Sequence, residues 1–318
     1  MRILCFKVDV NLNLAEQGRK MMAEKMVNAQ GLTEEEFLKQ YDPDKYATSN
    51  PALTVDMLLF TLQSDEKVDA AVTSPKHLEV LMIKRGDHPF MGKWALPGGF
   101  VTRNEDPKDA ALRELKEETG IDDVYMEQLY TWGAPERDPR THVVSISYMA
   151  LVDGTKLKVS AGDDASDAGW FKVNLEVANE KRDVAANGYT LETDYRLVLS
   201  DGYQQLCGSV KAIKSVKDGV VKTGYKLLKA EGIAFDHAVI ITYGLLQLRR
   251  KMWSTPVALS IMPQCFTMEQ LKGVYEAILG KKLSAEEFTG EILRTGMVAE
   301  AADKLYRFNP RWDCSNVV

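Results

Sequence analysis

The chain has 318 residues, of which 45% are hydrophobic and 27% are charged, and its formal net charge is −6. This length allows about two domains at the usual ~100–200 residues each, and the composition is that of an ordinary soluble globular protein. The acidic balance argues against a protein whose whole surface attracts nucleic acid, although it allows a local basic patch. No stretch approaches the ~20 apolar residues that span a bilayer, and the opening apolar run is too short for a signal peptide, so no membrane partner is expected.

The cysteines carry a second compositional signal. There are four, all widely separated and without C-x-x-C spacing: Cys5, Cys207, Cys265 and Cys314. This pattern favours free thiols in a reducing compartment, so we expect a cytoplasmic protein.

The first half of the chain contains a helical extension followed by strands. Residues 14–40 are predicted to be helical with a break near Gly31, and Thr33 and Glu36 form a capping-box pattern. Residues 54–62 and 78–83 have the apolar character of buried strands. The segment that follows, KRGDHPFMGKWALPGGF, is rich in Gly and Pro and is predicted to be a loop.

The sequence predicts a short helix at 107–118. Asp106 can cap it, Pro107 suits its first position, and Gly120 suits the left-handed residue just past its end. Glu114, Glu117 and Glu118 stand at i, i+3 and i+4, so their carboxylates project from one face. Such a cluster is either a solvated helix face or a site for a hard cation such as Mg²⁺, which relieves the mutual repulsion.

The second half begins with further strands, at 125–132, 143–151 and 169–173, with a turn at 161–164. Three segments within 176–233 then have the character of short strands with Gly turns. Near the C-terminus, Thr267 begins a helix that Gly280 ends, Ser284 caps another helix, and residues 297–309 are a candidate wing.

The stretch from Gly99 to Ile121 resembles the signature of a known family. It matches the Nudix box, G-x5-E-x7-R-E-U-x-E-E-x-G-U with U aliphatic, at every constrained position. These positions are Gly99, Glu105, Arg113, Glu114, Leu115, Glu117, Glu118, Gly120 and Ile121. The resemblance implies an α/β/α sandwich and a hydrolase that cuts nucleoside diphosphates linked to another moiety with Mg²⁺ or Mn²⁺.

The same resemblance implies roles for the residues of the box. Glu114, Glu117 and Glu118 would be the catalytic and metal-binding carboxylates, and the backbone at Gly98 and Gly99 would add a carbonyl ligand and let the diphosphate approach closely. Glu105 and Arg113 are interpreted as a structural ion pair between loop and helix.

A narrower resemblance points to the ADP-ribose-recognising branch of this family. It is carried by TVDMLLFTL, GKWALPGGF, GAPERDPRTHVVSISYMAL and AGDDASDAGWFKV, and later by AFDHAVIITYGLLQLRRKM, FTMEQLKGVYEAILGKKLSAEEF and KLYRFN. That branch includes regulators of NAD metabolism in which a Nudix domain is fused to a C-terminal winged helix. We therefore expect four parts: a helical extension at 1–50, a Nudix domain at 51–175, a β-rich insertion at 176–233 and a winged-helix-like domain at 234–318.

Residues outside the box complete the predicted site. Asp164, with Asp163, is the candidate for an additional metal-binding carboxylate, with Glu136 or Asp138 behind it, or these aspartates are turn residues. Arg137 and Arg140 either clamp phosphate or ribose or pair with Glu136 and Asp138. Arg85 and Trp94 flank the box, and Trp94 either stacks on a base or fills the core. His142 and His237 are interpreted as structural.

The C-terminal domain decides between a hydrolase and a regulator. The related regulators carry Arg or Lys on the second helix of this domain, where this chain has Glu286, Glu287 and Glu291. Because DNA binding depends on basic side chains that neutralise phosphates, DNA is not expected as a partner. The sequence favours hydrolysis of ADP-ribose to AMP and ribose 5-phosphate, with the C-terminal domain used for packing or in a homodimer. The alternative is an ADP-ribose-sensing transcriptional regulator.

Overall fold

The computed structural model describes residues 32–33, 36, 39–40, 51–64, 76–121, 126–153 and 165–313, and the chain divides into two compact units, 1–50 and 51–318. In the first unit, the backbone N–H of Thr33 donates to Glu36 and the backbone N–H of Glu36 donates to Thr33. These reciprocal bonds confirm the predicted capping box. The rest of the helix predicted at 14–40 lies outside the described residues.

The second unit is organised around a ten-stranded sheet with the strand order β10-β9-β8-β7-β2-β1-β6-β5, to which β3 and β4 pair at its side. Its strands are β1 (Ala52–Ser64), β2 (Lys76–Arg85), β3 (Trp94–Ala95), β4 (Gly98–Phe100), β5 (Glu127–Trp132), β6 (Val143–Val152), β7 (Ala165–Ala185), β8 (Gly188–Ser200), β9 (Gln205–Lys217) and β10 (Val220–Glu231). β1 and β6 pair in parallel, and the other pairs are antiparallel. The segment predicted as a loop before the box thus contains two short strands, β3 and β4, which extend the sheet.

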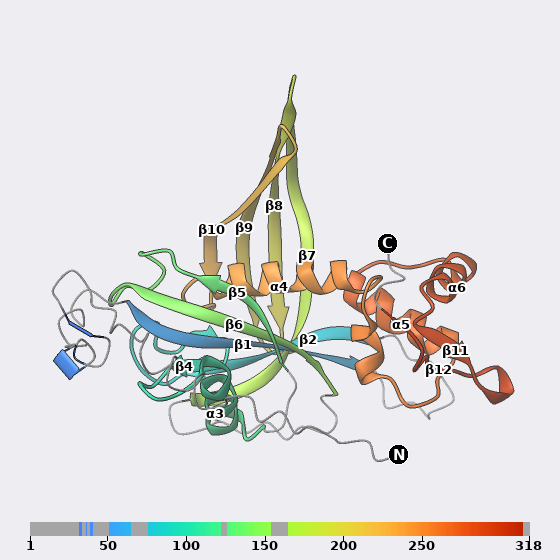
Figure 1. The fold of residues 1–318 in the computed structure, drawn as a ribbon, viewed down its shortest axis with the longest axis horizontal. Helices are drawn as coiled ribbons and strands as arrows, with labels where there is room; N and C mark the ends of the chain where they lie inside the picture. The colour runs from blue at the N-terminus through green and yellow to red at the C-terminus, as the bar shows by residue number, and fades with distance from the viewer. Residues whose placement is uncertain are drawn as a thin grey trace, which may run out of the picture. The chain divides into compact units, whose positions relative to one another are not determined.

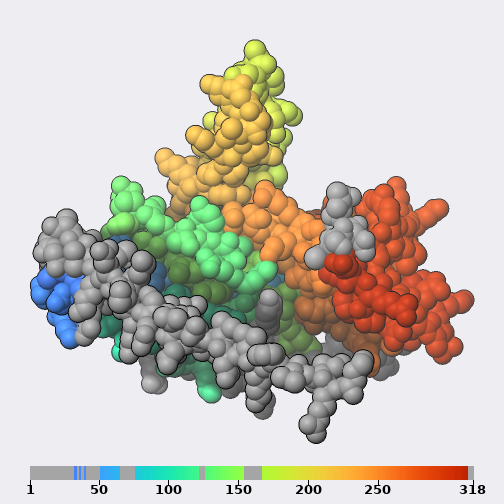
Figure 2. Space-filling model, in the orientation of Figure 1, coloured from blue at the N-terminus to red at the C-terminus, as the bar shows by residue number. Residues whose placement is uncertain are grey.

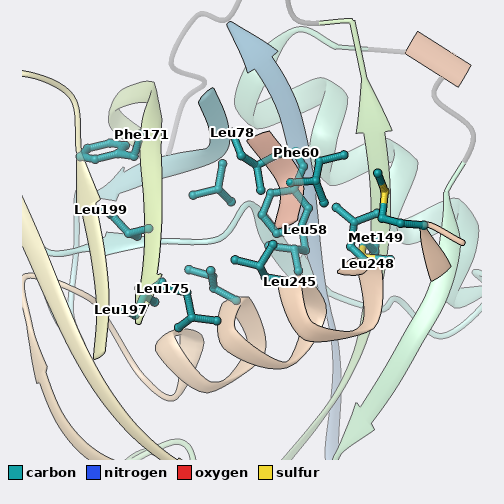
Figure 3. Close-up of a cluster of buried hydrophobic side chains, with 14 of the residues drawn as sticks. Leu58, Phe60, Leu78, Met149, Phe171, Leu175, Leu197, Leu199, Leu245 and Leu248 are labelled. Atoms are coloured by element: carbon teal, nitrogen blue, oxygen red, sulfur yellow. The ribbon is translucent and has the colours of Figure 1, made fainter. Parts of the chain in front are cut away.

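Helices cover both faces of this sheet, as Figure 1 shows. α3 (Pro107–Thr119) packs on one face, where Ala110, Ala111 and Leu115 join a core with residues of β1 and β6. α4 (His237–Lys251) packs on the other face. Figure 3 shows Leu245 and Leu248 of α4 directed toward Leu58 and Phe60 of β1. The predicted α/β/α sandwich is confirmed.

Local signals determine where α3 begins and ends. The side chain of Asp106 accepts from the backbone N–H of Lys108, Pro107 occupies the first turn, and Gly120 adopts φ 72° just past the end. The left-handed conformation at Gly120 costs little because glycine lacks a Cβ. The helix therefore starts and stops where the sequence predicts.

Strands β7 to β10 differ from the prediction of short strands with Gly turns. β7 runs without interruption from the central sheet into the insertion, so the boundary expected at 175/176 falls inside one strand. The outer ends of these strands, around 185–188 and 217–220, project away from α4 in Figures 1 and 2. Residues 176–187 are exposed, and without apolar alternation they gave no strand signal. The insertion enlarges the existing sheet.

The C-terminal part contains the predicted helices and wing. It consists of η3 (Pro256–Ile261), α5 (Met268–Leu279), α6 (Ala285–Arg294), β11 (Val298–Glu300), η4 (Ala302–Lys304) and β12 (Tyr306–Phe308). Thr267 and Gln270 form a capping box, Gly280 ends α5 at φ 71°, and Ser284 caps α6. Within the described residues, none of the helices combines the length and apolar character that a membrane crossing requires.

Candidate functional site

A cavity of about 960 Å³ opens where α3, β4 and the residues just before α4 meet; we call it the carboxylate pocket. It is lined by predicted site residues from the box and from loops on both sides of it. These are Arg85, Gly98, Gly99, Glu114, Glu117, Glu118, Arg137 and Arg140. The structure therefore brings together residues that are up to 55 positions apart in the sequence.

Two glycines allow the backbone to approach the other walls of the pocket. A Cβ atom at Gly98 would overlap the carbonyl oxygen of Val55, and one at Gly99 would overlap the carboxylate of Glu114. Any side chain at Gly99 would thus displace Glu114 from its position. The carbonyl ligand and the close approach of a diphosphate that were expected at these two glycines remain predictions.

Arg113 organises the acidic side chains around it. Its guanidinium donates twice to Glu105, at 2.7 and 2.9 Å, and also donates to Glu114 at 2.7 Å and Glu117 at 3.1 Å. The hydrogen bonds from Arg113 lower the pKa of Glu105 to about 2. The predicted Glu105–Arg113 ion pair is present, and the same guanidinium also holds two of the candidate metal ligands.

Glu118 has a different environment from the other carboxylates of the box. It is 9% exposed, whereas the side chain of Glu117 is 59% exposed. Burial raises the pKa of Glu118 to about 8, and the nearby charges of Glu114 and Asp56 add to this, although the backbone N–H of Gly98 donates to its carboxylate at 2.7 Å. A buried carboxylate that lines a cavity and whose pKa is raised in this way is typical of a functional site.

Cations and aromatic rings form the opposite wall. Arg140 donates to both oxygens of Asp138, at 3.0 and 2.7 Å, and its guanidinium lies 5.4 Å from the Phe100 ring. The guanidinium of Arg85 lies 5.1 Å from the ring of Phe235. The pairing of Arg140 with Asp138 was one of the two alternatives from the sequence. Both guanidinium groups nevertheless line the pocket, where an anion would meet them.

Arg137 is held by partners that the sequence did not suggest. It donates to both oxygens of Asp236, at 3.0 and 2.8 Å, and contacts Asp56 at 3.4 Å, and its side chain is only 6% exposed. Neither Glu136 nor Asp138, the partners considered from the sequence, forms an ion pair with Arg137. Arg137 therefore connects the loop after β5 to the residue that precedes α4.

His237 extends this connection to the segment before β4. Its Nδ1 accepts from the backbone N–H of Leu96 at 2.8 Å, and its Nε2 lies 3.5 Å from Asp56. Burial lowers the pKa of His237, so the ring is neutral and its Nε2 carries the proton toward Asp56. This placement matches the structural role predicted for His237.

Other predicted site residues lie elsewhere. Trp94 is 3% exposed, stacks edge-on against Phe171 at 4.7 Å and donates to Gln204, so its position matches the core alternative and not base stacking. Asp163 and Asp164 lie outside the described residues. Glu136 lines a different cavity from the carboxylate pocket.

Sequence reasoning missed the contribution from β1 and from the start of α4. Asp56, Phe235 and Asp236 line or support the site. One signal was available for Asp56, because it is the lone charged residue in the apolar run TVDMLLFTL. A buried charge in a strand requires a partner, which here is Arg137.

The acidic side chains of the pocket can be compared with the ligands that a Mg²⁺ ion needs. In the described part of the chain, no group of three or more His, Cys, Asp or Glu side chains is arranged to hold a metal ion. Mg²⁺ commonly takes only one or two carboxylates, together with water and substrate phosphate oxygens. Glu114 and Glu118 both line the carboxylate pocket and are the candidates for this role.

Comparisons with known proteins identify two domains. Residues 65–192 match the NUDIX domain family, and residues 258–308 match the NrtR DNA-binding winged helix domain. The "ADP-ribose pyrophosphatase" of Methanocaldococcus jannaschii is 40% identical over 139 residues, which cover 43% of this chain and 72% of that protein.

Two further relatives match nearly the whole chain. The "ADPR responsive transcriptional repressor NtrR" of Acinetobacter baylyi is 29% identical over 287 residues, 87% of this chain and 88% of that protein. The crystal structure of a MutT/nudix family protein from Enterococcus faecalis superposes with a TM-score of 0.60 at 27% identity and covers 89% of this chain and 100% of that one.

The expectation that DNA is not a partner is wrong. The winged-helix match and the full-length similarity to a repressor contradict it. The reasoning weighed only the acidic residues of α6 and the cations at its borders. It omitted Lys304, Arg307 and Arg311 in and beside the wing, all of which are exposed. Phosphate contacts can come from such residues and need not come from the helix.

Proposed function

Because this chain belongs to the Nudix family, with a C-terminal winged helix domain of the NrtR type, we propose that its carboxylate pocket hydrolyses the diphosphate bond of ADP-ribose in the presence of Mg²⁺ or Mn²⁺. The observation that carries the proposal is the buried Glu118, which lines this pocket together with Glu114, Arg85 and Arg140. The choice of ADP-ribose follows the pyrophosphatase that is 40% identical over the domain.

The residues of the pocket divide the work of this reaction. Arg85 and Arg140 bind and orient the diphosphate, while Phe100 and Phe235 offer apolar surface beside it. Glu114 and Glu118 would hold the metal ion, which when bound would polarise phosphate oxygens and offset developing negative charge. A water molecule attacks one phosphorus, the bridging P–O bond breaks, and AMP and ribose 5-phosphate leave.

The test is incubation of the purified full-length chain with ADP-ribose and MgCl₂, followed by chromatography of the products. We expect AMP and ribose 5-phosphate in equal amounts, with no turnover when EDTA replaces the metal. Nucleoside diphosphate sugars, NADH and dinucleoside polyphosphates form the comparison panel. If ADP-ribose stays intact while another compound is cleaved, the substrate assignment fails and the hydrolase assignment stands. If nothing is cleaved, both fail.

A second function is favoured by the C-terminal domain. We propose that this domain binds DNA and that ADP-ribose in the carboxylate pocket alters the binding, as the name of the repressor with 29% identity suggests. The link within the chain is α4, whose preceding residue Asp236 is bound by Arg137 and whose first residue His237 contacts the pocket's backbone and Asp56. A ligand that displaces either contact would move the start of this helix.

Gel shifts at low salt test the second function. The probes are the chain's own promoter region and promoters of NAD-biosynthesis genes, each with and without ADP-ribose, and a scrambled duplex is the control. We expect a sequence-dependent shift whose midpoint changes when ADP-ribose is added. Identical binding to all duplexes, or none, would contradict this function without bearing on hydrolysis.

A further inference from the structure

A second cavity, of about 1030 Å³, lies between the two edge strands of the large sheet, β5 and β10, beside α4; we call it the tyrosine cavity. It adjoins the carboxylate pocket at Phe235 and Arg137, which line both. Most of its lining comes from β5, β10 and α4, and of these elements only the first residue of α4, His237, lines the carboxylate pocket. Apart from the shared Phe235 and Arg137, the residues of the tyrosine cavity take no part in the proposed hydrolysis.

Aromatic rings from three elements meet in this cavity. The ring of Tyr243 on α4 lies 5.3 Å from Tyr130 and 5.5 Å from Trp132 on β5, and 5.2 Å from Tyr225 on β10. Trp132 is 9% exposed and donates from its indole to Ser147, so it belongs to the core. The tyrosine rings are on the open side, since Tyr130 is 48% exposed and the other two are half-buried.

This arrangement suits a planar ligand. Tyrosine rings held on strands and a helix lose little conformational entropy when a second ring stacks on them, because their backbone is already fixed. An aromatic cluster that only closed the core would be covered by other side chains. Here the rings line a cavity of about 1030 Å³, just above the roughly 300–1,000 Å³ that small-molecule sites have.

The charges around the rings favour an anion. Five cationic side chains line the cavity, namely Lys93, Arg137, Lys226, Lys229 and Arg250. Only two carboxylates do so among the described residues, those of Glu136 and Asp236, and Asp236 is already bound by Arg137. Arg250 lies beside the rings: burial raises the pKa of Tyr225 and of Tyr243, and the charge of Arg250 partly opposes both shifts.

Taken together, these features define the ligand class. We propose that the tyrosine cavity is a second ligand site, which binds a small molecule of the nucleotide class through stacking on Tyr130, Tyr225 and Tyr243 and through its phosphate on Arg250 and the neighbouring lysines. Aromatic rings beside guanidinium and ammonium groups match a base attached to a phosphate.

Calorimetric titration of the full-length chain with AMP tests the proposal. EDTA is present, so that no metal draws AMP into the carboxylate pocket, and adenosine and ribose 5-phosphate are titrated separately. We expect AMP to bind at least ~10-fold more tightly than either fragment, because only AMP satisfies both the rings and the cations. Tyr225→Ala and Arg250→Gln should each weaken AMP binding by roughly 5-fold or more.

Matched variants locate the site. Tyr203→Ala removes a fully exposed ring, and Lys214→Gln removes an exposed charge on β9, both outside the cavity, and neither should change the affinity. Tyr130→Ala removes a half-exposed ring of the same cavity. It replaces Tyr225→Ala in the test if that variant fails to fold. Arg85→Gln removes a cation of the carboxylate pocket and shows whether AMP binds there.

The outcomes separate the two chambers. Loss of AMP binding in Arg85→Gln but not in Tyr225→Ala or Tyr130→Ala would place AMP in the carboxylate pocket and overturn the proposal. Equal affinity for AMP and adenosine would overturn the assignment of an anionic ligand, and no binding at millimolar AMP would overturn the site itself. None of these results depends on whether the chain hydrolyses ADP-ribose.

Discussion

Two glutamates, one in the carboxylate pocket and one in the winged helix domain, are both largely buried yet have opposite environments. Glu118 has one backbone donor and two acidic neighbours, and its pKa rises to about 8. Burial alone would also raise the pKa of Glu276, but the N–H of Leu283 and the ammonium groups of Lys272 and Lys282 outweigh it and hold the value at about 2.

The difference in how the chain stabilises the two carboxylates distinguishes a residue of a binding site from a structural residue. Glu276 is fully compensated and fastens the turn between α5 and α6, so nothing is left for a ligand to satisfy. The ionised form of Glu118 is disfavoured by burial, so its pKa rises to about 8, and a cation beside it would remove that penalty. Buried charge that the chain itself does not compensate therefore marks the place where a partner is expected.

The largest expected effect is on turnover. Glu118→Gln and Glu114→Gln should each lower kcat for ADP-ribose by about 100-fold or more, because each removes a charge that holds the metal while preserving shape and helix propensity. Steady-state kinetics with circular dichroism as a folding check measures this. Asp109→Asn, an exposed acid on the same helix, is the matched control. Near-normal turnover in both variants would show that the metal assignment is wrong.

The second prediction concerns the stability of the metal-free protein. Because its folded pKa is raised to about 8, Glu118 stays protonated in the folded state while the unfolded chain loses the proton near pH 4.5. Stability contributed by this residue is therefore lost as pH rises from about 4.5 to about 8. Glu118→Gln cannot ionise and should escape that loss, which amounts to a few kcal/mol at about 1.4 kcal/mol per pKa unit.

Urea denaturation in EDTA at pH 5 and pH 8.5 measures the difference. The variant should match the wild type at pH 5 and exceed it at pH 8.5, and Mg²⁺ should narrow the gap. If the free energy of unfolding changed with pH by the same amount in both proteins, Glu118 would ionise freely in the folded state.

The compensated glutamate should respond in the opposite direction. Glu276→Gln keeps an acceptor for Leu283 but loses two charge-assisted bonds, so it should destabilise the C-terminal domain by about 1–2 kcal/mol at pH 7. Since the folded pKa is lowered to about 2, this stabilisation is present above about pH 4.5 and is lost as pH falls toward 2. Thermal unfolding of this variant and of Glu269→Gln, an exposed acid on the same helix, measures it. Equal melting temperatures of the two variants would show that the ion pairs of Glu276 do not stabilise the domain.

The features that the sequence predicted correctly are local. Asp106, Gly120, Thr267 and Ser284 cap their helices as expected because each makes its hydrogen bond within four residues of its own position. The box likewise places Glu114 and Glu118 through helix periodicity alone.

The features that it did not predict depend on long-range pairing. Arg137 bonds to Asp236 across 99 residues and to Asp56 across 81, and no spacing rule connects those positions. The length of β7 was missed for a related reason, since residues 176–185 are exposed and are held as a strand by pairing with β8. Trp94 gave an ambiguous signal, and only tertiary packing assigns it to the core.

The smallest expected effect tests the exposed charges of the C-terminal domain. Lys304 and Arg307 flank the wing and form no ion pair with any acidic side chain that the structure describes, unlike Arg294, which pairs with Glu291 at 3.3 Å. As with Glu118 and Glu276, the charged groups that lack a partner within the chain should be the ones that bind a ligand. Lys304 and Arg307 should therefore contact the DNA phosphates. The double variant Lys304→Gln/Arg307→Gln should weaken DNA binding about tenfold at moderate salt and lower the dependence of log K on log salt by about 2.

Fluorescence anisotropy with a labelled promoter duplex at several salt concentrations measures both quantities. Lys214→Gln, on β9, is the control for a general change in charge. The double variant Glu286→Gln/Glu287→Gln should strengthen DNA binding. Both glutamates lie in the first turn of α6, and their charges repel the DNA phosphates. If the wing variant binds with unchanged affinity and salt dependence, the contacts come from Lys281 and Lys282 at the turn before α6, and charge compensation does not distinguish the residues that meet DNA.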